Sequence, residues 1–544
     1  MNSRLQFYRL AVIFVVTIFA TQLCWSLATP LFSGPDEPTQ VIKAASVAYG
    51  EFSITQAHPY PSPYTIVKVP RIYTESSNYP LCFMFQPTQS AKCAGSFPPK
   101  IPITATRTAN NRSSEPPSQM VGALTYVGRY PPLYYLLVGL PGRFFSTAFS
   151  VYLMRTLSDL VSSVLIGVSL CLALDISQSE IRANEKTFSR RPLLTIGILL
   201  AIVPAFQFAS SVVNPNGLEA AAALGLWTSI ACLKFSRTEI QSKRSLYFCA
   251  ISACVEASMR GLSPFWVACS LLVGVLYLGK TRCLEIWSWH YTKVIGAISL
   301  IVCLADTAWI FLANTLEIAG ASCTKNCPSL YHNAVRTFGN TWQYVHQLIG
   351  TFGWINLITN NPARNTSIFG WEFWIYLGVI FSLLTVSVYS WMRTKSQGHW
   401  ADGLLDRSQF SINAQVVAIV GLLCLVVFLP VVIQASQANR FGFIWQGRYI
   451  MPLSTGLPVL GLAMAKDSTL TRNLGKISGI SWGILGCISL YATLHRYMVG
   501  TTGSLFIFGS NGWSPPISVA IICTLYLICT VVIVRAIVKP MKLQ

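Results

Sequence analysis

The amino-acid sequence predicts an all-α integral membrane protein with about twelve transmembrane helices. Of its 544 residues, 53% are hydrophobic and only 11% are charged, and its mean hydropathy is +0.51. An ordinary soluble domain carries a larger charged fraction. Apolar runs of the length that crosses a hydrocarbon core of roughly 30 Å recur along the chain. We therefore expect a single polytopic membrane domain over residues 1–544.

The expected spans follow one another with few interruptions. They lie near residues 9–29, 150–173, 192–212, 217–234, 246–259, 262–279, 294–313, 373–392, 414–434, 449–465, 477–494 and 517–537. The run 246–259 is short, but it completes an even number of crossings. The first run has a basic start like that of a signal peptide, yet no clear small-residue cleavage site follows it, so we expect it to stay as an anchor.

Basic residues in alternate loops predict the orientation of the spans. Lys and Arg in short loops are retained on the cytoplasmic side of a membrane during insertion. Such residues cluster before the first span, between residues 234 and 244, and between residues 280 and 293, and the alternation continues to the end of the chain. Both termini are therefore predicted to be cytoplasmic in a multi-pass protein of the cell membrane. The same code explains most of the formal charge of +20, so this charge does not indicate nucleic-acid binding.

Two long segments, residues 30–131 and 314–371, are predicted to lie on the extracytoplasmic side. Each holds one pair of cysteines, Cys82 with Cys93 and Cys323 with Cys327. Because an oxidising compartment permits disulfides, we expect both pairs to be bonded. The other twelve cysteines are mostly within or beside apolar runs, where small packing residues are the simpler interpretation.

The first outer segment begins with two carboxylates, Asp36 and Glu37, directly after the first span. From Val41 to Tyr49 apolar residues recur at helical spacing, and Gly50 suits the left-handed exit of a helix. We expect an amphipathic helix with Asp36 as its N-cap and with an apolar stripe on the membrane surface. A stretch near residues 64–69 is expected to be extended.

Several short motifs occur in an order that resembles a known family of bacterial membrane proteins. They are Gly34-Pro35-Asp36-Glu37-Pro38, Tyr130-Pro131-Pro132-Leu133-Tyr134-Tyr135, Asn214-Pro215-Asn216-Gly217-Leu218-Glu219, Gln446-Gly447-Arg448-Tyr449, Arg496-Tyr497 and Trp513-Ser514-Pro515-Pro516. The family is domain of unknown function 2142 (DUF2142), and its members look like relatives of the GT-C glycosyltransferases. This resemblance implies a GT-C-like helical fold with a long first outer loop.

The resemblance also implies a reaction: transfer of a sugar, with inversion, from a polyprenyl-phosphate carrier to an envelope glycan, lipid or protein. A carboxylate must take the proton of the acceptor hydroxyl, which makes Asp36 the expected base and Glu37 its substitute. The lipid phosphate that leaves needs fixed cations. Arg448 is the best placed, and Arg129, Arg440 and Arg496 also fall near outer span ends.

Other polar residues are expected to support this site. Glu219, Asn216 and Tyr449 lie in the motifs that carry the resemblance. Position 216 is an Asn where many relatives are expected to have an Asp, so we assign it no acid or base role. The six His residues are scattered and no phosphate-binding Gly-Lys-Ser/Thr loop occurs, which argues against a zinc site and ATP hydrolysis. The sequence predicts no obligatory metal, but Asp36, Glu37 and the donor phosphate could hold a divalent cation through oxygen ligands.

Two other functions fit the same sequence features. A transporter or flippase of a lipid-linked glycan would also have many spans and a basic outer groove, although no matching pair of Gly/Pro-broken spans is evident. A noncatalytic scaffold would use the outer segments to bind an envelope partner.

Overall fold

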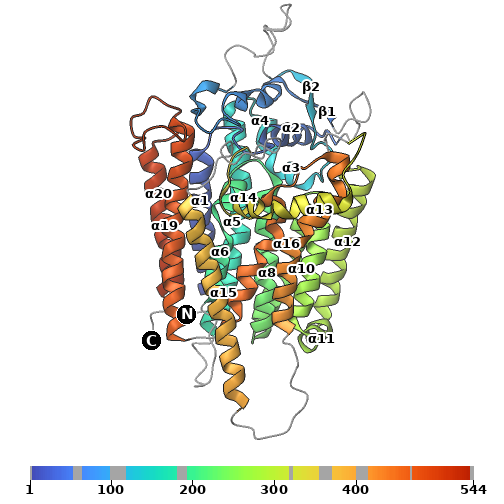
Figure 1. The fold of residues 1–544 in the computed structure, drawn as a ribbon, viewed down its shortest axis with the longest axis vertical. Coiled ribbons are helices and arrows are strands. Elements are labelled where there is room, and N and C mark those ends of the chain that lie inside the picture. Colours follow the sequence, from blue (N-terminus) through green and yellow to red (C-terminus); the bar gives the residue numbers. More distant parts are fainter. Residues whose placement is uncertain are drawn as a thin grey trace, which may run out of the picture.

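A bundle of long helices, capped at one end by a layer of short elements, makes up the protein (Figure 1). The computed structural model describes residues 3–52, 64–97, 118–179, 193–317, 323–354, 370–399, 414–465 and 468–539. The cap is built mainly from the first outer segment, and the long helices run away from it. This arrangement agrees with an all-α integral membrane protein.

Seven helices of the described residues are long and apolar enough to cross a membrane. They are α1 (Ser3–Ala28), α5 (Ala148–Ser179), α8 (Pro215–Phe235), α12 (His290–Leu312), α16 (Ala414–Phe441), α19 (Thr469–Val499) and α20 (Val519–Val538). Two bent pairs raise the number to nine if each pair is one span. These pairs are α6 (Leu193–Ala201) with α7 (Pro204–Ser210), bent by 64°, and α10 (Ser263–Leu278) with α11 (Lys280–Ser288), bent by 107°.

The expected number of twelve spans is therefore not confirmed. The three remaining apolar runs are helical, but none meets the length and hydropathy of a span. They form α9 (Glu239–Ala257), α15 (Gly370–His399), and a broken series of η6 (Gly447–Ile450), α17 (Met451–Ser454) and α18 (Gly456–Ala463). In the broken series Pro452 and Pro458 lie near helix starts, because a proline cannot donate the hydrogen bond that a continuous helix requires.

Basic residues from alternate loops meet at the end of the bundle opposite the cap. Arg244 lies over the ring of Phe7 at 4.1 Å and 3.5 Å from Asp175. Lys234 and Arg282 donate to the carbonyls of Leu278 and Leu233, at 2.6 and 2.9 Å. Both ends of the chain lie at this end of the bundle (Figure 1). The structure thus gathers the residues that the insertion rule groups together, while the side of the membrane that they face stays a prediction.

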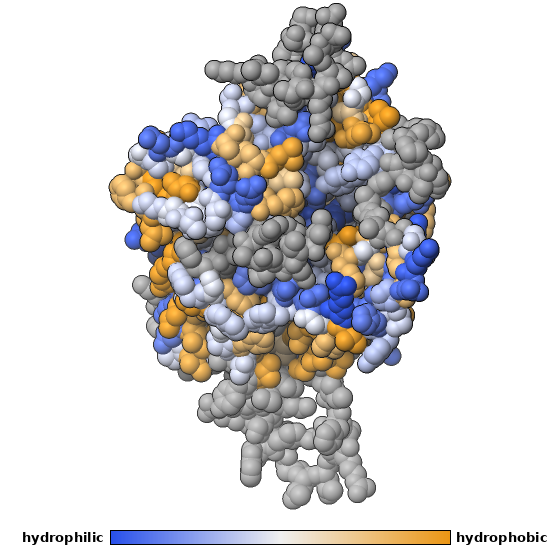
Figure 2. Space-filling model, turned by 45° about the horizontal axis from the view of Figure 1, so that its top comes forward, coloured by the Kyte–Doolittle hydropathy of each residue, from blue (hydrophilic) through white to orange (hydrophobic). Residues whose placement is uncertain are grey.

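The cap consists of a helix, a small sheet and short helical turns. Helix α2 (Glu37–Ala48) packs on β1 (Thr65–Pro70) and β2 (Met120–Thr125), which pair antiparallel with Thr65 opposite Thr125. The other elements are η1 (Arg71–Ser77), η2 (Tyr79–Cys82), η3 (Ala91–Ala94), α3 (Leu133–Val138) and α4 (Leu140–Phe144). Hydrophilic and hydrophobic residues lie side by side on the outer surface of this end (Figure 2). The stretch that we expected to be extended, residues 64–69, largely coincides with β1.

Helix α2 differs from its predicted environment. We expected its apolar stripe to lie on the membrane surface, but nearly all of its residues are buried inside the protein. Strands β1 and β2 and helices α3 and α4 cover it. Even Lys43 is fully buried, and its Nζ donates to the carbonyl of Gly128 at 2.5 Å. The helical periodicity was correct, but other parts of the same outer segment provide the apolar surface that α2 packs against.

The second outer segment supports the loop that carries Arg448. Its helices are α13 (Leu330–Gly339) and α14 (Thr341–Gly350). The Oε1 of Gln347 accepts a hydrogen bond from the backbone N–H of Gly447 at 2.8 Å. A Cβ atom on Gly447 would lie 2.2 Å from the carbonyl oxygen of Tyr344. Only glycine fits this close approach, which fixes the position of the next residue, Arg448.

A buried ion pair joins the cap to the bundle. The Nε and Nη2 of Arg155, on α5, donate to the two carboxylate oxygens of Glu37 at 2.7 Å each. Arg155 also donates to the backbone carbonyls of Ser26, Thr29 and Pro30 at the end of α1. Glu37 accepts from the N–H groups of Gly34 and Val213 at 3.2 and 3.1 Å. Both side chains are fully buried, so one pair fixes the ends of α1, α2 and α5 and the segment before α8.

We predict that Arg155→Met removes most of the protein from the folded fraction. Breaking a buried pair leaves a charge without a partner and costs about 3–5 kcal/mol. Thermal unfolding in detergent, followed by size-exclusion chromatography, measures the loss. The matched control is Lys243→Met, because its pair with Glu239 is exposed and such pairs contribute about 0.5 kcal/mol or less. Equal melting temperatures for the two variants would contradict the structural role of Arg155.

Candidate functional site

Asp36 is the N-cap residue of α2, as expected, but its side chain does not cap the helix. Its backbone carbonyl accepts from the N–H groups of Thr39 and Gln40 at 3.0 and 3.1 Å. Its φ of 65° is in the left-handed region, which costs a non-glycine residue energy and is often found at functional sites. Its side chain makes no cap hydrogen bond. The expected N-cap position is therefore confirmed, but the side-chain hydrogen bond that usually accompanies it is not made.

The carboxylate of Asp36 pairs with Arg448 instead. The Nη2 of Arg448 donates to Oδ2 of Asp36, and the hydroxyl of Tyr126 donates to Oδ1 at 2.5 Å. The Asp36 side chain is 26% exposed, whereas that of Arg448 is 8% exposed. The structure thus brings together two of the residues that the sequence predicted for one site, across 412 positions of the chain.

Arg448 has donors that the described residues leave unused. Its Nε and Nη1 are buried and have no hydrogen-bond partner in the described part of the chain. A buried donor without an acceptor costs about 1–3 kcal/mol, and more for a charged group. Such a group is a candidate for binding an anion, because a guanidinium can hold a phosphate through two parallel hydrogen bonds.

A small cavity lies beside Arg448. Its volume is about 20 Å³, which is room for about one water molecule. Its walls come from the Gly-Pro-Asp-Glu-Pro motif, α7, the Asn-Pro-Asn-Gly turn and α14; they include Pro35, Phe208, Asn214, Asn216 and Thr351. Asp36 does not line the cavity and is connected to it through Arg448. The motifs that contain Pro35 and Asn214 are held together here, since Asn214 Nδ2 donates to the carbonyl of Pro35 at 2.8 Å.

A second cation, Arg260, extends the site. It lies in the turn between α9 and α10, and its Nη1 donates to Oδ1 of Asn216 and lies 3.6 Å from Oε2 of Glu219. The Ser263 hydroxyl donates to the other oxygen of Glu219 at 2.5 Å. The guanidinium groups of Arg260 and Arg448 lie 4.6 and 5.3 Å from the ring centre of Tyr449. The three supporting residues predicted from sequence, Glu219, Asn216 and Tyr449, therefore surround Arg260.

Two tyrosines from the loop after β2 contact these ion pairs. Burial raises the pKa of Tyr126 well above its usual value, and the negative charge of Asp36 raises it further. Burial also raises the pKa of Tyr130, although the neighbouring Arg260 opposes that shift. Both phenols therefore stay protonated at neutral pH, and Tyr126 serves as a neutral donor to Asp36.

The structure places the other predicted site residues outside this cluster. Glu37 is committed to Arg155 and is fully buried, so it cannot act as a second base in this arrangement. Arg129 pairs with Glu317, at 3.3 Å, and Arg440 is 69% exposed and lies 4.0 Å from the same carboxylate. Among the four arginines expected to bind phosphate, Arg448 is the one beside Asp36.

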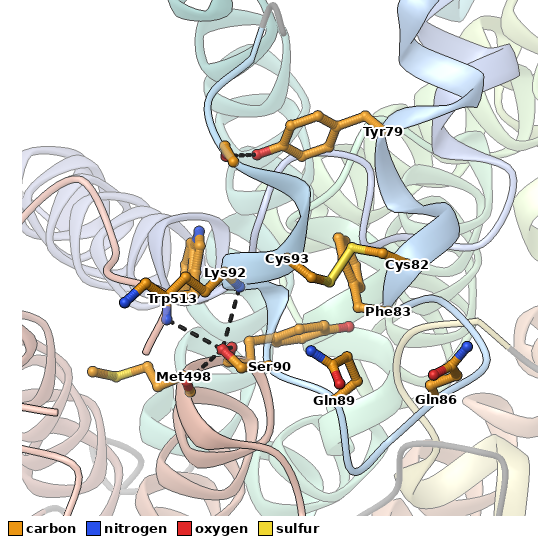
Figure 3. Close-up of a disulfide and its surroundings, with 12 residues drawn as sticks. Tyr79, Cys82, Phe83, Gln86, Gln89, Ser90, Lys92, Cys93, Met498 and Trp513 are labelled. Atoms are coloured by element: carbon orange, nitrogen blue, oxygen red, sulfur yellow. Dashed lines mark hydrogen bonds between the residues drawn. A yellow bond between two sulfur atoms is a disulfide. The ribbon is translucent and has the colours of Figure 1, made fainter. Parts of the chain in front are cut away.

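Arg496 holds a loop of the cap in place. Its guanidinium donates to the carbonyls of Phe83, Gln86 and Gln89 at 2.8, 3.1 and 2.7 Å. This loop is closed by the Cys82–Cys93 disulfide (Figure 3). In the same view Ser90 donates to the carbonyl of Met498 and accepts from the N–H of Trp513, at 2.6 and 3.2 Å. The last two motifs of the resemblance thus anchor the disulfide loop, and the other expected pair, Cys323 with Cys327, is also bonded.

A metal would find few ligands here. No group of three His, Cys, Asp or Glu residues lies together among the residues described. Glu37, which we expected to help hold a cation, has both oxygens engaged by Arg155. Asp36 would be left as the carboxylate ligand next to a donor phosphate, and its existing partners are a guanidinium and a phenol.

Arg260 and Tyr126 were missed by the sequence reasoning. Arg260 had a usable signal, because a lone arginine between two spans on the predicted outer side runs against the insertion rule. Tyr126 had none, since its position depends on the pairing of β1 with β2 and on the loop that follows. Lys43 holds that loop through Gly128, and it too was overlooked.

Lys43 predicts a pH dependence of stability. Burial lowers the pKa of Lys43 to about 8, against about 10.4 in an unfolded chain. Between these values the unfolded state binds more protons, so the contribution of Lys43 to the free energy of unfolding rises with pH. We expect the melting temperature of wild type relative to Lys43→Met to increase from pH 8 to pH 10. Parallel melting curves across this range would show that burial does not lower the pKa of Lys43.

Comparisons with known proteins identify the family. The family model described as "Predicted membrane protein (DUF2142)" matches residues 19–457, which is well over half of the chain. The match includes the motifs around Asp36, Asn216 and Arg448, and it ends before Arg496 and Trp513. No curated protein and no solved structure matches the chain, so the comparisons do not extend to the GT-C enzymes. The chain belongs to the DUF2142 family of predicted membrane proteins.

Proposed function

We propose that this protein is an inverting glycosyltransferase that takes a sugar from a polyprenyl-phosphate carrier and adds it to an envelope glycan, lipid or protein. The supporting observation is the Asp36–Arg448 pair, in which Arg448 keeps two buried donors that make no hydrogen bond to any residue the structure describes. A carboxylate next to an anion-binding guanidinium is the combination that this reaction requires. The membrane bundle suits a donor whose tail is a lipid.

In the proposed reaction Asp36 and Arg448 have separate roles. The acceptor oxygen attacks the anomeric carbon, while the bond from that carbon to the phosphate oxygen breaks and the lipid phosphate leaves with the electron pair. Asp36 accepts the proton of the acceptor hydroxyl. Arg448 stabilises the charge that develops on the phosphate, since fixed cations in a site without water are effective at this task.

Binding of the donor would change the pair itself. A cavity of about 20 Å³ is too small for a phosphate with its sugar, so the site must open around Arg448. A phosphate that engages Nε and Nη1 of Arg448 competes with Asp36 for the same guanidinium. The carboxylate is then released toward the acceptor only when the donor is present, and Tyr126 still orients it through Oδ1.

A transporter or flippase of a lipid-linked glycan is the second candidate. One observation favours it: α6 and α7 are bent by 64°, and α7 supplies Phe208 to the cavity wall. Broken helices beside a binding site are frequent in transporters. In that case Arg448 would bind the lipid phosphate. Asp36 would neutralise the charge of Arg448 when no lipid is bound, and it would not accept a proton from an acceptor.

We predict that Asp36→Asn abolishes transfer without loss of the protein. The amide cannot accept the proton, and removal of a general base costs roughly 10²- to 10⁴-fold in rate. The measurement is the glycosyl composition and linkage of the cell envelope in wild-type, deletion and variant strains at matched protein levels. Glu317→Gln is the control, because it removes a carboxylate paired with another arginine of the outer region.

The envelope analysis separates the two candidates. Loss of the same terminal sugar in the deletion and Asp36→Asn strains, with a normal envelope in the Glu317→Gln strain, supports the transferase. If the deletion removes a whole glycan while Asp36→Asn behaves like wild type, the transferase proposal fails and the flippase is favoured.

Arg448 gives an independent prediction. In proteoliposomes, free polyprenyl phosphate should inhibit sugar transfer by competing with the donor, and Arg448→Gln should weaken this inhibition about tenfold or more. A charged group that loses a bidentate phosphate contact loses about 1.5–3 kcal/mol. Arg440→Gln serves as the control because that arginine is exposed. An unchanged inhibition constant for Arg448→Gln would remove Arg448 from the phosphate site.

A further inference from the structure

A groove lies between α19 and α20, which run side by side at one edge of the bundle (Figure 1). Its volume is about 630 Å³. Ile480 and Ile484 form one wall, and Leu527 and Val531 form the other. All four side chains are at least 37% exposed. The groove is thus an open apolar surface on two helices that are long and apolar enough to span a membrane.

Small residues form the floor of the groove. A Cβ atom on Gly483 would lie 2.9 Å from Cγ2 of Thr530, so the two helices approach closely at this point. Large branched side chains project on either side of the contact. The groove is therefore a consequence of the sequence of the two helices, which place glycine and threonine between isoleucines, leucine and valines.

One end of the groove is basic. Arg535 on α20 and Lys539 directly after that helix complete the lining, and both are exposed. On α19, Lys476 lies one turn before Ile480, so it is on the same helix face and extends the basic end. This end is where the chain termini lie (Figure 1). The groove combines an apolar length with cationic side chains at one end.

The length of the groove fits one leaflet of a bilayer. Lys539, the C-cap of α20, is twelve positions after Leu527, which is about 18 Å at a rise of about 1.5 Å per residue. Half of a hydrocarbon core of roughly 30 Å is about 15 Å. An acyl chain of a phospholipid in the leaflet next to the termini can therefore follow the groove while its phosphate stays level with Arg535 and Lys539.

We propose that this groove is a binding site for an anionic phospholipid of the leaflet next to the chain termini. The acyl chain packs along Ile480, Ile484 and Leu527, and the headgroup phosphate binds Arg535 and Lys539. Basic pockets between membrane helices bind anionic headgroups in this way. The proposal is independent of the glycosyl-transfer function. A bound lipid bridges α19 to α20, and the far end of α19 carries Arg496, which holds the disulfide loop.

The test is native mass spectrometry of the full-length protein in detergent, with phosphatidylglycerol and phosphatidylcholine added separately. We expect wild type to retain phosphatidylglycerol in preference to phosphatidylcholine. Since each Lys or Arg near the membrane surface contributes roughly fivefold to binding of an anionic lipid, the double variant Arg535→Gln/Lys539→Gln should weaken retention roughly thirtyfold. Ile484→Trp, which fills the groove, should lower occupancy with both charges intact.

The matched control is Lys280→Gln/Lys293→Gln, which removes the same charge from exposed positions of α11 and α12. It should retain phosphatidylglycerol like wild type. Size-exclusion chromatography verifies that all variants fold. The proposal fails if the two double variants lose the lipid equally, if phosphatidylcholine binds as well as phosphatidylglycerol, or if polyprenyl phosphate displaces phosphatidylglycerol from the groove, which would indicate a substrate site.

Discussion

The buried pair between Glu37 and Arg155 is the constraint on which the rest of the structure depends. It fixes the exit of α1, the start of α2, one side of α5 and the turn before α8 with one set of hydrogen bonds. All of these segments carry polar backbone groups that would otherwise be buried without partners. Asp36 precedes Glu37 by one residue, so the same pair sets the direction in which the Asp36 carboxylate can point. The left-handed backbone of Asp36 is maintained because its neighbour cannot move.

The candidate site around Asp36 consists of arginines that are each paired with a carboxylate. Arg448 is balanced by Asp36 and Arg260 by Glu219, while Tyr126 and Tyr130 contact the two pairs from a single loop. Lys43 and the backbone of Gly128 hold this loop against α2. An anion that binds Arg448 must therefore displace a carboxylate, and this exchange would couple donor binding to release of the base in the reaction that we propose.

Local sequence patterns predicted where the helices lie along the chain, but they did not predict what surrounds each helix. Apolar runs located the membrane helices, and the spacing from Val41 to Tyr49 with Gly50 located α2. The sequence could not indicate that α2 would be buried, because β1, β2 and the helices that cover it come from positions far along the chain. The sequence also could not show that Glu37 has a structural role, because its partner Arg155 lies 118 residues away. The run 449–465 was counted as a span because hydropathy ignores the breaks that Pro452 and Pro458 introduce.

A structure of the protein with bound polyprenyl phosphate tests the central claim most directly. We predict that the phosphate contacts Nε and Nη1 of Arg448 and that the Asp36 carboxylate has separated from the guanidinium while it keeps its hydrogen bond to Tyr126. A phosphate bound elsewhere, with the Asp36–Arg448 pair intact, would contradict the account.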